Sequence, residues 1–131
     1  MTKTFLKISL IILLSILFAS CDDTLTVEDV DNRTIPDSNV SYSQHISPIF
    51  ELKCVRCHGN GRLEADLNLT HPFYFVDGHI VVPGESGNSV LIWRIDPQYA
   101  LGIMPPPPNI PLTPNQIQGV KTWIDEGAKS N

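Results

Sequence analysis

Hydrophobic residues recur with a helical period in three stretches of the chain, all of them after residue 40. The first stretch runs from Ser41 to about Lys53, with apolar residues three and four positions apart. Pro48 lies inside it, and proline interrupts a helix interior because it has no N–H group to donate. The pattern therefore predicts a helix that is kinked at Pro48, or one that begins at Ser47 with Pro48 at the first helical position.

The second stretch is shorter and follows a long irregular region. Ser89 is placed to cap a helix that continues through Ile95 and is ended by Pro97. Before it, residues 71–83 mix aromatic and β-branched side chains around the turn signal Asp77-Gly78. This region is expected to form a small hairpin or a loop.

The third stretch is the clearest helix. Thr113 and Gln116 form a capping box, and Pro114 between them occupies the first helical position. Gly127 can end the helix. Its apolar face is formed by Ile117, Val120, Ile124 and Ala128. Together with eleven prolines and no internal repeat, the pattern predicts a small, mainly α domain with long loops.

The first 20 residues have the pattern of an export signal. Lys3 and Lys7 precede an apolar run, Ile8 to Phe18, which suits a signal-peptide core and is too short to span a bilayer. The small residues before Cys21 resemble the lipobox of bacterial lipoproteins, although Phe18 stands where that family usually has Leu. The resemblance implies cleavage before Cys21 and a lipid on this cysteine. Ordinary secretion or a retained N-terminal anchor is the alternative.

Charge and size exclude several classes of protein. The 131 residues include 9 Lys and Arg against 14 Asp and Glu, a net charge of −5, which argues against nucleic-acid binding. Residues 1–20 hold two of the cations and no acid, so their removal leaves −7 over 111 residues. The length excludes a multidomain enzyme, and three cysteines are too few for a disulfide scaffold.

The mature chain divides into a tether and one domain. Residues 21–40 contain six acids and one Arg with no sustained apolar period, which predicts an acidic, flexible tether. As a coil, residues 22–40 would span about 25 Å. A short edge strand at Thr24–Val27 is the alternative. Residues 41–131 form the predicted domain, whose small apolar core would gain stability from a bound apolar cofactor.

The chemistry of the chain centres on Cys54-Val55-Arg56-Cys57-His58. The spacing Cys-x-x-Cys-His is the attachment signature of c-type haem. Residues three apart lie on one face of a helical turn, so both thiols can reach one edge of a haem while His58 supplies an imidazole to the iron. A redox-active disulfide and a zinc site are the alternatives; the adjacency of Cys57 and His58 argues against zinc.

Met104 is the favoured second ligand of the iron. It lies 46 residues after His58 and precedes four prolines, 105–108, which favour an extended polyproline segment. The alternative is that Met104 simply packs in the core. Three histidines are alternative candidates for the second iron ligand: His45, His71 and His79.

With these residues in view, the sequence resembles the small class I cytochromes c, in particular the planctomycete-type cytochrome c domain. The matching pieces are Ile46-Ser47-Pro48-Ile49-Phe50, Cys54-Val55-Arg56-Cys57-His58-Gly59, Leu67-Asn68-Leu69, Val81-Val82-Pro83-Gly84, Ser89-Val90-Leu91, Met104-Pro105-Pro106 and Trp123-Ile124-Asp125-Glu126-Gly127-Ala128. The resemblance implies a helical fold wrapped around one covalent haem c, with His58 and Met104 as axial ligands, and one-electron transfer. Residues 70–80 do not align, which leaves His71 and His79 open as ligands.

The sequence therefore predicts an electron carrier and not an enzyme, since it shows no acid–base pair for bond-making chemistry. A haem-based sensor, in which a small ligand displaces the sixth ligand, is the alternative function. We expect an exported protein, lipid-anchored through Cys21 and facing the periplasm or cell surface. Its acidic surface favours redox partners with a basic docking patch. Candidates to neutralise haem propionates are Arg56, Arg62 and, preferred, Arg94, and Phe50, Trp93 and Trp123 are expected to pack the haem or the helix contacts.

Overall fold

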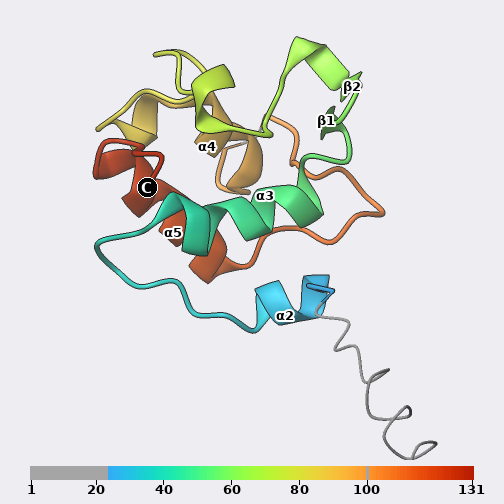
Figure 1. The fold of residues 1–131 in the computed structure, drawn as a ribbon. Helices are drawn as coiled ribbons and strands as arrows, with labels where there is room; N and C mark the ends of the chain where they lie inside the picture. The colour runs from blue at the N-terminus through green and yellow to red at the C-terminus, as the bar shows by residue number, and fades with distance from the viewer. Residues whose placement is uncertain (1–23, 100) are drawn as a thin grey trace, which may run out of the picture.

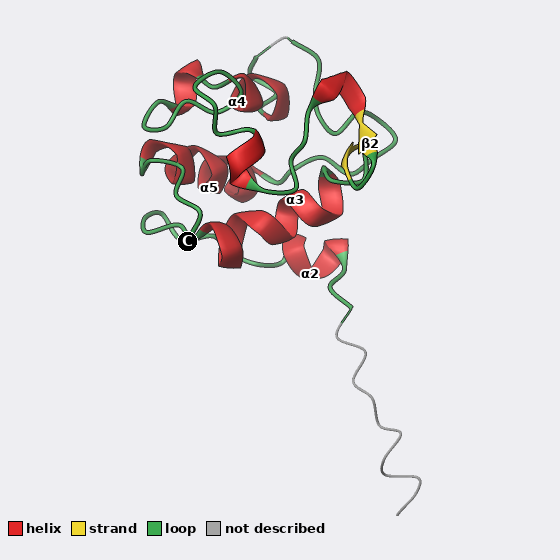
Figure 2. Cartoon of the chain, turned by 45° about the horizontal axis from the view of Figure 1, so that its top comes forward, coloured by secondary structure: helices red, strands yellow, loops and turns green. Residues whose placement is uncertain are grey.

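The computed structural model describes residues 24–99 and 101–131. Short helices and helical turns make up most of the regular structure in these residues (Figures 1 and 2). The elements in chain order are α2 (Val27–Asp31), a π-helical turn (Tyr42–Ile46), α3 (Ser47–Lys53), β1 (His58–Gly59), β2 (Arg62–Leu63), 3-10 turns at Glu64–Asp66, Pro72–Tyr74 and Ser86–Asn88, α4 (Val90–Ile95) and α5 (Pro114–Asp125). In both views α3 and α5 lie between α2 and α4. None of the helices in the described residues is long and apolar enough to span a bilayer.

The first predicted helix exists, and Pro48 determines where its α-helical part begins. A π-helical turn over Tyr42–Ile46 precedes α3, and the Ser47 N–H donates to the Tyr42 carbonyl, five residues back. The helix becomes α-helical from Ser47, with Pro48 in its first turn, where a missing N–H leaves no internal bond unmade. Of the two sequence predictions, the start at Ser47 is the closer one.

The caps of α4 and α5 differ. The predicted capping box of α5 is present, since the Thr113 Oγ1 accepts from the Gln116 N–H at 3.2 Å and the Thr113 N–H donates to Gln116 Oε1 at 3.0 Å. Helix α4 follows Ser89, but this side chain does not cap it. The Ser89 hydroxyl is fully buried, donates to the Glu85 carbonyl and accepts from the Val82 N–H. Residues 71–83 form a loop with one 3-10 turn rather than a hairpin.

An aromatic cluster lies in the core between α3 and α5. Its members are Tyr42, Phe50, Phe75 and Trp123, with ring centroids 5.4 to 6.4 Å apart in the contacting pairs. Each of the four is at most 6% exposed. The Trp123 indole also donates to the Lys129 carbonyl at 2.9 Å, which satisfies its polar edge. This cluster fixes the packing of α3 against α5.

The prediction of a flexible tether is wrong for residues 24–40. Thr26 and Asp29 form a capping box that starts α2, so the acids here serve the helix N-terminus rather than only solvation. Val30, Ile35 and Val40 are each less than 5% exposed and belong to the core. The alternative strand at Thr24–Val27 is absent, and the predicted signal peptide at residues 1–20 and Cys21 lie outside the described residues.

Polar contacts fasten the same segment to the last helix and its end. The Ile35 N–H donates to Asn115 Oδ1 at 2.8 Å, and Asn115 Nδ2 donates to the Ile35 carbonyl at 3.2 Å. The Glu126 carboxylate accepts from two successive backbone N–H groups, those of Asn39 at 2.6 Å and Val40 at 2.8 Å. Residues 24–40 are therefore part of the domain.

This packing leads to a test with opposite signs in two backgrounds. A Cβ at Gly119 would lie 2.6 Å from Ile35 Cγ2, so Gly119→Ala should lower the free energy of unfolding by about 1–3 kcal/mol through overpacking. An Ile35→Gly background removes all three of the nearest atoms, including the Ile35 Cβ at 3.0 Å, and there the same change should be stabilising by up to ~1 kcal/mol because Ala favours helix over Gly. Denaturant unfolding measures both effects. Equal signs in the two backgrounds would show that Ile35 does not pack on α5.

Candidate functional site

A cavity of about 590 Å³ opens between α3, α4 and the loop that joins α4 to α5. Its volume falls within the range of about 300–1,000 Å³ that is usual for cofactor sites. Most of its wall is apolar, with side chains from every part of the fold that surrounds it, including Val27, Leu52, Leu67, Leu69, Ile80, Val90, Leu91, Ile95, Pro105 and Ile110. The structure brings four sequence-predicted site residues to this wall: Cys54, Cys57, His58 and Met104.

The two cysteines lie in a tight turn at the end of α3. The N–H groups of Cys57 and His58 both donate to the Cys54 carbonyl, at 3.0 and 2.9 Å. Cys54 is buried and Cys57 is half-buried, and both carry free thiols. Burial raises the pKa of the Cys54 thiol to about 12, against the opposing effect of Lys53, so this thiol is neutral at physiological pH.

The His58 ring is held by the carbonyl of Glu64. His58 Nδ1 lies 2.9 Å from this oxygen, and since a carbonyl can only accept, Nδ1 carries the proton. In the neutral imidazole, Nε2 is then left with its lone pair free to bind a metal. A carbonyl partner on the other ring nitrogen is the usual support of a ligating histidine.

A short hairpin that sequence reasoning missed places this carbonyl. β1 and β2 pair antiparallel, with His58 opposite Leu63, and residues 60 and 61 form the turn between them. Asn60 and Gly61 both have positive φ, at 50° and 87°. Asn-Gly is the residue pair that favours a two-residue hairpin turn. The signal was therefore present in the sequence, and its effect is to return Glu64 to His58.

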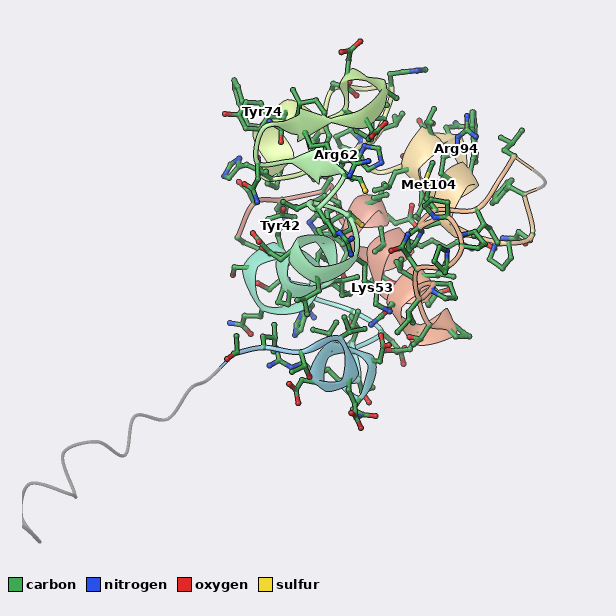
Figure 3. The ribbon with its side chains drawn as sticks, turned by 90° about the vertical axis from the view of Figure 1, so that its right-hand side faces the viewer. Tyr42, Lys53, Arg62, Tyr74, Arg94 and Met104 are labelled. Carbon is green, nitrogen blue, oxygen red and sulfur yellow. The ribbon has the colours of Figure 1, made fainter. Side chains whose placement is uncertain are left out.

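Met104 reaches the cavity from the loop between α4 and α5. Its N–H donates to the Arg94 carbonyl at 2.7 Å, which ties the residue to the end of α4, and its side chain is 37% exposed (Figure 3). The four prolines after it do not form the continuous extended polyproline segment that the sequence predicts, because the Met104–Pro105 and Pro107–Pro108 peptide bonds are cis.

Comparison with known families agrees with this geometry. Residues 54–108 match the family model described as Planctomycete cytochrome C. The match supports a planctomycete-type cytochrome c domain in this part of the chain. The matched range begins at Cys54 and includes His58, α4 and Met104, whereas α2, α3 and α5 lie outside it. No curated protein and no solved structure matches the chain.

A cytochrome c domain implies haem, and the residues of this cavity fit that group. The apolar wall suits the macrocycle, and the two thiols and the free Nε2 of His58 supply the attachment and ligand chemistry. The charged residues in the wall are all cations, namely Lys53, Arg56 and Arg94. Such a wall suits a ligand that carries two carboxylates.

The three arginines that are candidates to pair with haem propionates differ in their position relative to the cavity. Arg56 and Arg94 line the cavity, but the Arg94 guanidinium also donates to the Leu101 carbonyl. Arg62 does not line the cavity and instead bonds the Glu64 carboxylate through Nε and Nη2, at 2.9 and 2.7 Å. Arg62 is therefore not placed for a propionate in this structure.

The competing side chains lie elsewhere in the domain. His45, His71 and His79 do not line the cavity. His45 Nδ1 accepts from the Ser41 N–H and His71 Nδ1 from the Phe73 N–H, so both rings serve local turns. Phe50, Trp93 and Trp123 also lie outside the wall: Phe50 and Trp123 belong to the aromatic cluster, and the Trp93 indole donates to the Gly87 carbonyl at 2.8 Å. In residues 24–99 and 101–131 no group of three or more His, Cys, Asp or Glu is arranged to hold a metal ion, which disfavours the zinc alternative.

Proposed function

We propose that this protein carries single electrons on one haem c, attached through Cys54 and Cys57 and ligated by His58 and Met104. When bound, a haem with His and Met ligands exchanges one electron at its iron, and the thioether raises the reduction potential. The observation that carries the proposal is the convergence of these four side chains, from two separate segments, on one cavity.

The residues of the chain have distinct tasks in this proposal. Cys54 and Cys57 keep the cofactor from dissociating. His58 binds through Nε2, because its Nδ1 proton is held by the Glu64 carbonyl. Met104 would supply the second protein ligand to the iron and so would keep other ligands off it. Arg56 lies where a guanidinium can pair with a carboxylate of the cofactor.

The surroundings of the protein belong to the same proposal. The pattern of residues 1–20 supports export, and Cys21 supports a lipid anchor that holds the domain at a bacterial membrane, on the periplasmic side or the cell surface. The net charge of −7 without residues 1–20 supports redox partners that present a basic patch. Such partners would be other electron-transfer proteins, and no reaction on a substrate is assigned to this chain.

The test is an absorption spectrum of the full chain made with the c-type haem maturation machinery. We expect haem that stays on the protein in a denaturing gel, a far-red thioether–iron band in the oxidised form, and no binding of carbon monoxide by the reduced form. Covalent haem without the band, together with rapid carbon monoxide binding, would favour a haem-based sensor. A chain with no covalent haem would contradict the cytochrome proposal altogether.

A further inference from the structure

The ammonium group of Lys53 is buried at the rim of the cavity. Its side chain is 2% exposed, which is rare for lysine. The group has three N–H donors and three acceptors: Asp31 Oδ1 at 2.5 Å, the Pro111 carbonyl at 2.8 Å and Gln116 Oε1 at 3.3 Å. These acceptors belong to α2, to the loop before α5, and to α5 itself. Lys53 thus joins three segments at one point.

One of the three acceptors lies on the chain that carries Met104. We call residues 101–112 the strap. Its first part is bound by Arg94, whose carbonyl accepts from the Met104 N–H and whose guanidinium donates to the Leu101 carbonyl. At its other end, the Lys53 ammonium donates to the Pro111 carbonyl.

The strap has little means to fasten itself between these two ends. Five of its residues are prolines, at 105–108 and 111, and proline has no N–H to donate. In the described residues, the hydrogen bonds of its middle part run from Asn109 N and Nδ2 to the Pro106 carbonyl, both within the strap. The Lys53 bond is therefore the polar attachment that holds the far end of the strap to the domain.

Asp31 keeps the Lys53 ammonium directed at the strap. Its Oδ1 accepts from Lys53 and also from Gln116 Nε2 at 2.9 Å, while Gln116 Oε1 accepts from Lys53 and from the Thr113 N–H. Gln116 is fully buried and the Lys53 side chain is 2% exposed, whereas the Asp31 side chain is 24% exposed, so the network is closed to water on the Gln116 side only. Asp31 lies on α2, outside the residues that match the cytochrome c family model.

We propose that Lys53, directed by Asp31, is a positioning residue for Met104. It anchors the strap at Pro111 so that the thioether stays at the cavity, and α2 takes part in holding the sixth ligand. The inference rests on the proposed function, because it assigns to these residues the stability of the bond between Met104 and the haem. Loss of the Lys53 anchor leaves the far end of the strap held by the buried side chain of Leu112 without a polar contact at Pro111, and it removes no residue that would bind the metal.

The test compares Lys53→Met with a matched control. Methionine keeps the length and the apolar stem of lysine but lacks the three donors; removal of one partner of a buried ion pair is itself destabilising, so the folded fraction of the variant is measured first. Lys121→Met is the control, because Lys121 also forms a partly buried ion pair, with Asp96 at 2.6 Å, but lies outside the cavity wall. Because Lys53→Met leaves Asp31 unpaired, the double variant Lys53→Met/Asp31→Asn serves as the second test chain.

The readout is binding of imidazole to the oxidised haem protein, followed by loss of the thioether–iron band. We expect the apparent affinity for imidazole to rise about tenfold or more in Lys53→Met and in the double variant. The size of this change corresponds to the loss of one hydrogen bond from a charged group, which no longer opposes displacement of Met104. We expect Lys121→Met to stay within about twofold of the wild type. Amide hydrogen exchange at Met104, whose N–H donates to the Arg94 carbonyl, should also speed up in the Lys53 variants alone.

The outcomes separate this inference from the function on which it rests. A wild-type protein with the band, and Lys53 variants with unchanged imidazole affinity and unchanged exchange, would overturn the inference and leave the proposed function standing. A wild-type protein without the band would contradict Met104 ligation, and with it both proposals.

Discussion

A chain in which Cys54 and Cys57 are both replaced by alanine should retain no haem on a denaturing gel. These are the two thiols at the cavity, so their removal leaves no sulfur there that can form a thioether. Haem staining of the denatured protein measures the effect, which should be complete. Each single variant keeps one thiol and should keep some covalent haem.

The third cysteine provides the control for this result. Cys21→Ser removes a thiol that sequence analysis assigns to a lipid and not to haem. Its stain should equal that of the wild type, provided that the protein is recovered from the soluble and membrane fractions together. Haem that survives denaturation in the double variant would refute attachment at the Cys-x-x-Cys motif.

Met104→Ala should abolish the far-red thioether–iron band and open the haem to small ligands. Met104 is the one methionine among the described residues, and it lines the cavity that also contains His58. The reduced variant should bind carbon monoxide, whereas the reduced wild type should not. Its reduction potential should fall, because a thioether ligand favours the reduced iron.

Histidine variants decide whether the effect is specific to Met104. His71→Ala and His79→Ala remove the two imidazoles that the sequence left open as ligands, and both residues lie on the loop at 71–80, outside the cavity wall. Both variants should keep the band and exclude carbon monoxide. If the band persists in Met104→Ala, or disappears in either histidine variant, Met104 is not the sixth ligand.

The features that sequence analysis predicted well depend on residues close together in the chain. The capping box at Thr113 and Gln116 needs only four consecutive residues, and α5 formed as predicted. Helix α4 also lies between Ser89 and Pro97 as predicted, although the Ser89 side chain does not cap it. The attachment motif is equally local, since its spacing lies within one turn.

The features that it missed depend on distant partners. Val30, Ile35 and Val40 are five residues apart, which fits neither a helix nor a strand, so their burial is apparent only once α5 provides the surface for them. The role of each arginine likewise depends on which carbonyl or carboxylate the fold brings near it. The hairpin at Asn60-Gly61 escaped notice for another reason: its strands are two residues long, too short to show alternation.

The packing of α2 has a consequence for how this protein would meet its partners. With a lipid on Cys21, the chain from that residue to Val27 spans at most about 20 Å in any conformation. Val27 lines the cavity itself. With such an anchor the cavity would lie close to the bilayer, and a redox partner would have to reach it there.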